Sequence, residues 1–381
     1  MRILVLTHEY PPVGGGGGRV AQDVCAGLAV RGHSVRVLTA HCADLPLFEE
    51  RQGVEVHFLK SGRAELFRAS LKAMAGYVWQ AFWQGWKHIR AWKPDVIHAQ
   101  FAVPAGAAAW ALSIVSGTPY VLTAHLGDVP GGTPEKTGGW FHMIYPFTPP
   151  IWKRAARVTA VSDFTRSLAL ARYPVTVEVI PNGVDLQEAA AGAIVANQPP
   201  VVVFAGRFMQ QKNVVQIARV MNRLADQDWR CLMLGDGPLK PEVEEEIARG
   251  GCAQRFELPG WVTPQQVLDA FGRADILFMP SYSEGLPVVG VQAMAKGLAL
   301  ALSSAGGNPE LVQEGRNGIL LAPEDEAGYE EALRGWLSSP ETLLAARQAS
   351  RELAQRFDLV KIIDAYEQVL RAAARSAGKN T

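Results

Sequence analysis

The feature that most constrains this chain is a repeated alternation between short apolar runs, rich in β-branched residues, and longer amphipathic stretches. Such alternation is typical of βαβ units, in which a helix connects two parallel strands. The expected strands are Ile3–Thr7, Ser34–Thr39, Val54–Leu59, Asp95–His98, Pro119–Thr123, Arg157–Val161 and Thr176–Ile180, then Val201–Ala205, Arg230–Leu234, Phe256–Leu258, Ile276–Met279, Ala299–Ser303 and Ile319–Leu321. The sequence therefore predicts an α/β fold built on doubly wound parallel sheets.

The alternation pauses between residues 188 and 200, which are rich in alanine and end in a Pro-Pro pair. This composition suits a connector. We therefore expect two Rossmann-like domains, residues 1–190 and 191–360, that face a central cleft, because such sheets bind ligands at the carboxyl ends of their strands. Apolar residues at helical spacing predict a C-terminal helix, of which residues 361–381 would cross back to the N-terminal domain.

Composition excludes several other classes of protein. The 381 residues are enough for two cores, and 37 basic residues balance 37 acidic ones, so we expect no nucleic-acid partner. The run Ile3–Thr7 is too short for a signal-peptide core or a membrane span. The cysteines lack the spacing of metal ligands, so we expect reduced thiols, no metal and a cytoplasmic protein. They are Cys25, Cys42, Cys231 and Cys252.

Five glycines, Gly14 to Gly18, follow the first expected strand, and the next helix is expected to begin near Val20. Backbone N–H groups of such a loop can bind an anion at a helix N-terminus. The alternative is a flexible loop without a ligand. Because Arg19 and Ala21 stand where a G-x-G-x-x-G pattern needs glycine, a dinucleotide-binding enzyme is disfavoured, and no P-loop motif is present.

Two cations, Arg207 and Lys212, lie in the turn that follows the first strand of the second domain. Fixed cations there could stabilise the negative charge of a leaving nucleotide diphosphate without a metal. The alternative is a pair of solvated side chains, although cations at a helix start oppose the helix dipole. The sequence thus favours a site for an anionic ligand.

Four motifs, in order along the chain, resemble the retaining GT-B glycosyltransferases of glycosyltransferase family 4. They are P-P-x-x-G-G at residues 11–16, G-R-x-x-x-x-K-N at 206–213, S-E-G-L-P at 283–287 and G-G-x-P-E-L-V at 306–312. Residues 180–185, I-P-N-G-V-D, also match a family motif. The resemblance covers most of the chain, and it implies a GT-B fold and transfer of a sugar from a nucleotide-diphosphate donor.

The resemblance also implies roles for particular residues. Arg207 and Lys212 would hold the donor diphosphate and Glu284 would contact the transferred sugar. Gly15 and Gly16 would approach the donor from the first domain, and Val262 would contact the base. The segment that would approach the sugar and phosphate with its backbone comprises Gly285, Leu286, Pro287, Val288 and Val289.

One position departs from the family pattern. Gln292 stands where the family usually has a second glutamate that accepts hydrogen bonds from the donor ribose. A carboxylate accepts from both hydroxyls of a diol, whereas an amide has one acceptor oxygen. The change would weaken donor binding by about 1 kcal/mol.

His125 follows the expected strand 119–123. A lone histidine is more often a structural residue, but the resemblance implies that this one contacts the donor sugar or supports the transition state. We therefore count His125, Arg207, Lys212 and Glu284 as the expected catalytic residues. No arrangement of serine or cysteine with histidine indicates a covalent nucleophile.

Two aromatic segments remain. Trp79, Trp83 and Trp86 share one helical face with cations nearby, which suits either an aromatic core face, the favoured interpretation, or an interfacial patch for a membrane. A second cluster, residues 140–152, lies where an acceptor loop could be.

The interpretation of the whole chain is a metal-independent, retaining hexosyltransferase with no cofactor. It would use a nucleotide-sugar donor, UDP before GDP, and a saccharide or lipid-linked acceptor in polysaccharide assembly. The alternatives are a nucleotide-sugar epimerase of GT-B shape and a non-catalytic nucleotide-sugar-binding protein. The cytoplasmic protein would have a peripheral membrane contact if the tryptophan face were exposed; the sequence does not identify the sugar, the linkage or the oligomeric state.

Overall fold

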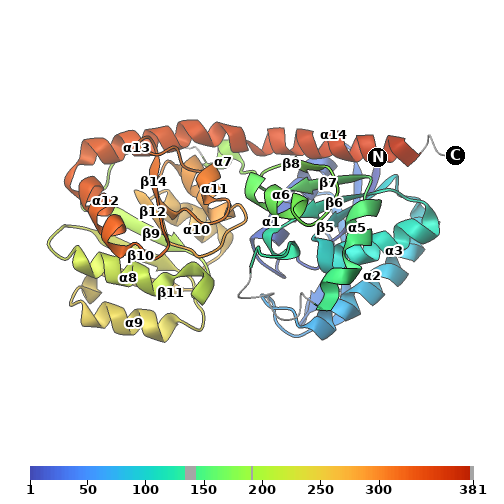
Figure 1. Ribbon diagram of the computed structural model, residues 1–381, viewed down its shortest axis with the longest axis horizontal. Helices are drawn as coiled ribbons and strands as arrows, with labels where there is room; N and C mark the ends of the chain where they lie inside the picture. Colours follow the sequence, from blue (N-terminus) through green and yellow to red (C-terminus); the bar gives the residue numbers. More distant parts are fainter. Residues whose placement is uncertain (134–142, 190–191, 378–381) are drawn as a thin grey trace. The chain divides into compact units, whose positions relative to one another are not determined.

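The computed structural model describes residues 1–133, 143–189 and 192–377 (Figure 1). It divides the chain into unit 1, residues 1–182 with the chain from residue 359 onward, and unit 2, residues 183–358. The sequence interpretation places these boundaries later, at 190/191 and 360/361. The Val184 N–H donates to the Phe357 carbonyl at 2.9 Å, and Val184 forms a bridge with Asp358. The chain therefore enters and leaves unit 2 at paired residues.

Unit 1 contains an eight-stranded sheet of order β3-β4-β2-β1-β5-β6-β7-β8. The strands are β1 Arg2–Leu6, β2 Ser34–Cys42, β3 Phe48–Arg51, β4 Val54–Arg63, β5 Val96–Gln100, β6 Tyr120–Ala124, β7 Arg157–Ala160 and β8 Val177–Val179. All neighbours are parallel except β3 and β4. The seven expected strands of this half are confirmed. β3 is not among them, because its half-exposed Phe-Glu-Glu-Arg sequence contains no apolar run.

Helices cover the sheet of unit 1 on both faces. They are α1 Gly16–Val30, α2 Leu71–Trp92, α3 Ala107–Ser116, α5 Pro149–Arg154, α6 Asp163–Leu170 and α14 Leu359–Ala377. Leu4 and Leu6 of β1 pack in one core cluster with Tyr77 and Ala81 of α2. Alternate residues of a strand point to opposite faces, so the intervening residues of β1 face away from α2.

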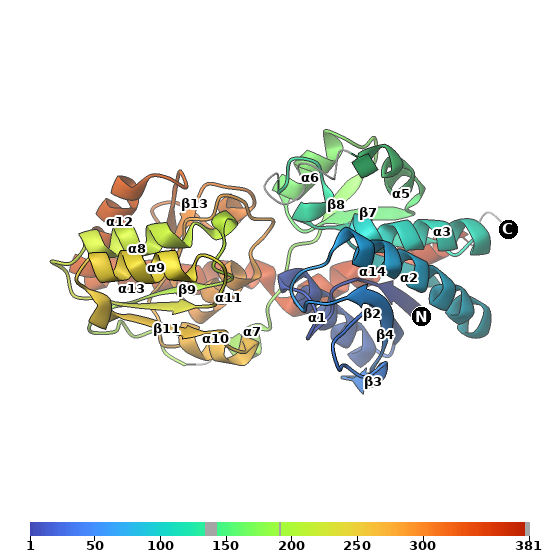
Figure 2. The ribbon, with the colours of Figure 1, turned by 90° about the horizontal axis from the view of Figure 1, so that it is seen from below.

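Helix α14 packs on α1 within unit 1 (Figure 2). A Cβ at Gly27 of α1 would lie 2.1 Å from Ile363 Cδ1, so glycine permits the close approach. The Glu367 carboxylate accepts from Arg31 at 2.9 Å and from His33 Nε2 at 3.0 Å. Hydrogen bonds from Arg371, then Arg31 and His33, lower the pKa of Glu367 to about 2. The C-terminal helix is therefore held to unit 1 by packing and charge.

The favoured interpretation, in which Trp79, Trp83 and Trp86 share a core face of α2, is wrong. The side chain of Trp79 is 63% exposed and that of Trp83 is 45% exposed. Only Trp86 packs against the core cluster. The buried face of α2 consists instead of mostly small side chains, which let the helix lie close to the sheet. The buried residues of α2 are Ala73, Tyr77, Ala81, Gly85 and Ile89.

The second aromatic cluster divides in a similar way. Trp140 and Phe141 lie outside the described residues. Trp152 is fully buried and stacks on Tyr173 with ring centroids 4.3 Å apart, whereas Phe147 is 76% exposed. The end of this cluster therefore belongs to the core of unit 1.

Unit 2 contains a six-stranded parallel sheet of order β11-β10-β9-β12-β13-β14. The strands are β9 Val201–Ala205, β10 Arg230–Leu234, β11 Phe256–Gly260, β12 Ile276–Met279, β13 Ala299–Ser303 and β14 Gly318–Leu321. The helices are α7 Leu186–Ala189, α8 Val214–Arg223, α9 Lys240–Arg249, α10 Pro264–Phe271, α11 Val288–Lys296, α12 Glu326–Ser338 and α13 Pro340–Leu353. This strand order is that of a dinucleotide-binding Rossmann sheet, and all six expected strands are confirmed.

Both sheets have a point where the chain reverses its direction of winding. It falls between β1 and β5 in unit 1 and between β9 and β12 in unit 2. Loops that leave the carboxyl ends of two such strands diverge, and the crevice between them is where open α/β sheets bind ligands. The expected site residues follow β1 and β6 in unit 1 and β9, β11 and β12 in unit 2.

Candidate active site

Lys212 and Glu284 form an ion pair at the switch point of unit 2. Lys212 ends the short 3-10 helix η4, Gln210–Lys212, after β9, and Glu284 lies in the loop after β12. Lys212 Nζ lies 2.5 Å from Glu284 Oε1, and the two side chains are 18% and 7% exposed. The structure therefore brings together two predicted site residues that lie 72 positions apart in the sequence.

The backbone around Glu284 fixes the direction of its side chain. The Gly307 N–H donates to the Glu284 carbonyl at 3.0 Å, and the Gln211 side chain donates to the Ser283 carbonyl at 2.7 Å. Gly306 has φ +64°, and a Cβ there would lie 1.9 Å from the Glu284 carbonyl oxygen. Glycine at this position is therefore required both by the backbone conformation and by the close approach. The loops after β9, β12 and β13 thus form one hydrogen-bonded frame.

The start of α11 lies immediately after this loop. Pro287 is the N-cap residue, and Val288 and Val289 form the first turn. The first N–H groups of a helix have no acceptor within the helix, and the helix dipole favours an anion near them. Gln292 is half-buried and lies one turn after Val288, on the same side of α11.

Arg207 and Val262 lie at the same carboxyl edge of the sheet. Arg207 is half-buried two residues after β9, and the neighbouring Phe208 N–H donates to the Asp236 carbonyl at 2.9 Å. Val262 is half-buried two residues after β11. Because β10 separates β9 from β11, Val262 lies farther along the edge than the cations do.

The glycine segment of unit 1 is a helix start and not only a loop. α1 begins at Gly16, four residues before the expected start near Val20. A Cβ at Gly18 would lie 3.0 Å from the Glu9 backbone, and one at Gly17 would lie 2.7 Å from Phe101 Cζ. The glycines therefore let the first turn of α1 lie against the loop after β1 and the end of β5. Gly15 and Gly16 are exposed.

Glu9 is a residue of this site that the sequence interpretation missed. Its Oε2 accepts a hydrogen bond from the Gly15 N–H at 3.0 Å. A carboxylate of the chain thus occupies a backbone donor that an anionic ligand would use, and a ligand would have to displace it. Its sequence signal is a position three residues after β1, which polar residues at the ends of other strands share.

His125 lies directly after β6 and is 8% exposed. Its Nε2–H donates to Gln100 Oε1 at 2.9 Å, and its backbone N–H donates to Asp128 at 2.8 Å. The ring stacks on Phe101 with centroids 4.2 Å apart. Burial lowers the pKa of His125 to about 4, so the ring is neutral near pH 7 and its Nδ1 is an acceptor. Neutral His125 can therefore accept a hydrogen bond from a hydroxyl group.

A buried polar network supports His125. Gln100 uses its carbonyl oxygen for His125, so its NH₂ donates to His98 Nε2, 3.2 Å away. His98 Nε2 also lies 2.8 Å from Thr123 Oγ1. Burial lowers the pKa of His98 to about 3. Neither Gln100 nor His98 was predicted as a site residue, although His98 ends the predicted strand and Gln100 ends β5.

Phe101 is held in an unusual conformation beside this network, with φ +76°. Positive φ in a non-glycine residue is strained, and such residues cluster at functional sites. The strained backbone turns the ring of Phe101 onto His125. Burial also raises the pKa of Asp128 to about 7, although backbone N–H groups donate to it. The loops after β5 and β6 thus concentrate strain and buried titratable groups.

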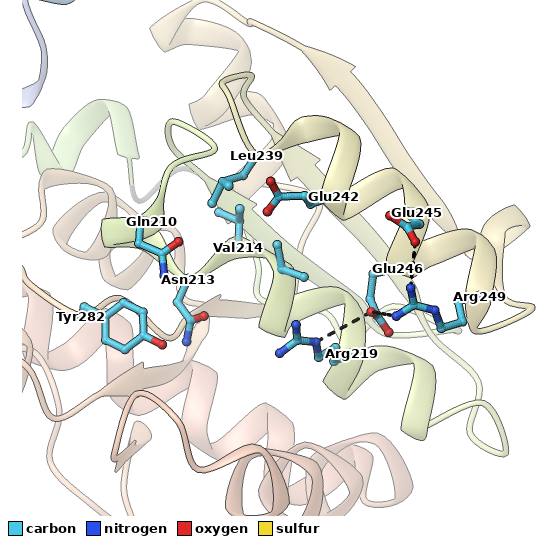
Figure 3. A pocket seen from close by; sticks show the side chains of 11 residues that line it. Gln210, Asn213, Val214, Arg219, Leu239, Glu242, Glu245, Glu246, Arg249 and Tyr282 are labelled. Atoms are coloured by element: carbon cyan, nitrogen blue, oxygen red, sulfur yellow. Dashed lines mark hydrogen bonds and ion pairs between the residues drawn. The ribbon is translucent and has the colours of Figure 1, made fainter.

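A cavity of about 310 Å³ lies between α8 and α9 of unit 2, beside η4 (Figure 3). Its rim carries three carboxylates, and Glu246 pairs with Arg219 at 3.7 Å and with Arg249 at 2.8 Å. Glu242 adds negative charge to the same rim. Neither Lys212 nor Glu284 lines this cavity, and its acidic rim disfavours a diphosphate. We therefore do not assign donor binding to it.

The described residues contain no group of three or more histidine, cysteine, aspartate or glutamate side chains that could hold a metal ion. All four cysteines are buried free thiols.

Comparisons with known proteins agree with this geometry. The model "Glycosyltransferase Family 4" matches residues 14–188, and the model "Glycosyl transferases group 1" matches residues 199–339. An alpha-maltose-1-phosphate synthase of Mycolicibacterium smegmatis is 28% identical over 92% of this chain and 94% of its own. A 2-deoxystreptamine glucosyltransferase of Streptomyces kanamyceticus is 27% identical over 70% of this chain and 75% of its own.

Solved structures show the same fold. A sucrose-phosphate synthase from Thermosynechococcus elongatus has a TM-score of 0.85 at 20% identity, and covers 97% of this chain and 98% of its own. HepE of Anabaena in complex with UDP has a TM-score of 0.75 at 19% identity, and covers 98% of this chain and all of its own. Fold and site thus define a GT-B glycosyltransferase, which confirms the predicted architecture. The chain belongs to glycosyltransferase family 4 and is a hexosyltransferase that uses a nucleotide-sugar donor.

Proposed function

We propose that this protein transfers a hexose, with retention of the α configuration and without a metal, from a nucleotide-diphosphate sugar to a saccharide or lipid-linked saccharide. The observation that carries the proposal is the Lys212–Glu284 ion pair at the switch point of unit 2. Glu284 lies immediately before the segment that leads into α11. A cation for the leaving group and a carboxylate for the sugar stand side by side there. The product would belong to polysaccharide or envelope assembly.

Charge stabilisation is the chemistry that this half-site supplies. As the bond between sugar and diphosphate breaks, negative charge develops on the leaving phosphate. Lys212, Arg207 and the first N–H groups of α11 can stabilise that charge, which is the work that a bound metal does in other enzymes. Lys212 already has Glu284 as a partner, so donor binding would convert a direct ion pair into one shared with phosphate. The buried Glu284 would then accept hydrogen bonds from sugar hydroxyls.

The unit 1 residues would act on the sugar and the acceptor. Neutral His125 can accept a hydrogen bond from a sugar hydroxyl through Nδ1, which faces the first turn of α1. Gly15 and Gly16 would contact the donor after displacement of Glu9. Retention is the family mechanism that the resemblance implies, and it needs no covalent nucleophile.

Gln292 and Val262 would contact the nucleoside. Their positions on α11 and after β11 suit the ribose and the base, respectively. UDP is proposed before GDP because HepE of similar fold binds UDP and UDP-glucose.

Two other functions follow from the same fold. An epimerase would convert the donor sugar without any acceptor, and a non-catalytic protein would bind the donor without releasing the nucleotide. Gln292 motivates the second of these, because it removes one acceptor from the ribose site. Analysis of the products separates all three.

The protein would work in the cytoplasm with a peripheral membrane contact. Among the helices in the described part of the chain, none is long and apolar enough to cross a membrane. A lipid-linked acceptor would therefore be reached from the membrane surface.

The test is thermal unfolding of the purified protein with UDP-, GDP- and ADP-sugars in the presence of a metal chelator. A ligand that binds only the folded state raises the melting temperature by mass action, and a concentration 100-fold above Kd adds about 2.7 kcal/mol. The proposal predicts a shift with UDP-sugars. A shift that appears only when a divalent metal is added would contradict metal independence, and no shift with any donor would favour the loss of donor binding at Gln292.

A further inference from the structure

The exposed face of α2 combines aromatic residues with cations. Its solvent-facing residues form a stripe along the helix, which we call the α2 stripe: Lys72, Ala75, Trp79, Trp83, Lys87 and Arg90. At 100° per residue these six positions fall within about 60° of one direction, opposite the buried face. The two tryptophans therefore occupy the middle of the stripe and cations occupy both ends.

Charge along this segment has one sign. Between Leu66 and Pro94 the sequence contains five lysines and arginines and no aspartate or glutamate, in a chain whose formal net charge is zero. The five are Arg68, Lys72, Lys87, Arg90 and Lys93, and all are exposed. Within the described residues none of the five has an ion-pair partner. The segment is therefore a local positive surface whose cations no carboxylate in the described part of unit 1 pairs with.

The tryptophans have no structural reason to be exposed. Their rings contact each other edge to face with centroids 5.8 Å apart, yet they leave 63% and 45% of their surface in water. Tyr77 and small side chains already fill the core side of α2. The exposure of the two tryptophans is therefore not the result of crowding in the core. The adjoining rings form an exposed apolar patch flanked by cations, and exposed apolar patches with a polar rim are typical of interaction sites.

We propose that the α2 stripe docks on the surface of a membrane that contains anionic lipids. Tryptophan favours the depth of the lipid headgroups, where an apolar ring and its N–H are both accommodated. Lysine and arginine reach the headgroup phosphates with their charged ends while their stems lie on apolar surface. Aromatic residues at the centre and cations at both ends match this environment, whereas a protein partner would not require the absence of every acid over the whole segment.

This inference deepens the proposed membrane contact, since it names the surface and the lipid charge. It does not depend on glycosyl transfer. Its test contains no nucleotide sugar, so failure of vesicle binding leaves donor binding intact, and failure of donor binding leaves vesicle binding intact.

The experiment is co-sedimentation of the full-length protein with vesicles of phosphatidylcholine alone or mixed with phosphatidylglycerol, at low and high salt. The wild type should sediment only with the anionic vesicles, and less so at high salt. The Lys72→Gln, Lys87→Gln, Arg90→Gln triple variant should bind on the order of 100-fold more weakly, at roughly fivefold for each cation. The Trp79→Ala, Trp83→Ala double variant should bind about tenfold more weakly.

Trp261→Ala is the matched control, because Trp261 of unit 2 is also 52% exposed but lies outside the stripe. It should bind vesicles as the wild type does. Thermal unfolding checks that each variant is folded. Equal binding to neutral and anionic vesicles, absence of binding to either, or unchanged binding of both stripe variants would overturn the proposal. So would self-association that is lost in the tryptophan variant while vesicles are not bound, which would assign the stripe to a second copy of the chain.

Discussion

At the scale of single residues, function depends on charges whose positions the backbone fixes. Glu284 is 7% exposed and directed at Lys212 by the frame of loops around it. A buried charge pair is costly to break on one side, because the remaining charge stays in a poorly solvated place. Substitutions at this pair therefore affect stability and catalysis together, and the two must be measured separately.

Lys212→Ala should lower turnover by about 100-fold or more, through loss of charge stabilisation on the leaving diphosphate. Melting temperature should also fall, because Glu284 loses its partner, so turnover is measured well below the variant's transition. Lys240→Ala is the control, since Lys240 is a half-exposed lysine of the same unit whose nearest carboxylate is 3.5 Å away. Turnover of Lys212→Ala equal to that of the control would remove the assigned role.

Gln292→Glu should tighten donor binding by roughly fivefold, because the carboxylate restores a second acceptor for the ribose hydroxyls, at about 1 kcal/mol. Calorimetric titration with the donor measures the change. Unchanged affinity would show that the ribose does not contact this position.

Asp128→Asn tests the buried carboxyl beside His125 through its pH dependence. The pKa of Asp128 is raised from 3.8 to about 7, so the folded state holds a proton that the unfolded state has released. Its contribution to stability is therefore present below pH 4 and lost as pH rises to 7. The stability of the wild type relative to Asp128→Asn should fall across that range by on the order of 2–4 kcal/mol. Denaturant unfolding at several pH values measures it, and a pH-independent difference would contradict the burial of this group.

At the scale of elements, every strand except β3 could be predicted from the sequence. The core strands of parallel sheets are buried on both faces and therefore form continuous apolar runs. The start of α1 could not, since five glycines have little helix propensity and only the close approach of Glu9 and Phe101 explains a helix there. The exposure of Trp79 and Trp83 was also missed. Periodicity indicates which residues share a helical face, but it does not indicate which face meets the sheet.

Gly306→Ala tests the frame that positions Glu284. Alanine there would be strained by φ +64° and would overlap the Glu284 carbonyl, whereas Gly315 has a similar φ of +73° and open space around it. Gly315→Ala should therefore cost only about 1–2 kcal/mol of strain, and Gly306→Ala should cost several kcal/mol and weaken donor binding. Equal melting temperatures for the two variants would show that the close approach at Gly306 is unimportant.

At the scale of the whole molecule, two sheets and their topological switch points account for where the predicted site residues fall. The sequence placed Arg207, Lys212 and Glu284 after two strands of one sheet, and the strand order makes those strands neighbours. It could not supply Glu9, Gln100 or His98, because polar residues at strand ends are common and only the fold shows which ends converge. The division between the units likewise depends on the pairing of Val184 with Phe357, a contact between residues far apart in sequence.

The most direct test of the central claim measures nucleoside diphosphate release and the configuration of the product together. The purified protein is incubated with a UDP-hexose, a metal chelator and a panel of saccharide acceptors, and the new linkage is assigned by NMR. Release should depend on an acceptor and match the new glycosidic bond mole for mole, and the new linkage should be α. An inverted linkage, a changed donor sugar without acceptor, or tight binding without release would contradict it.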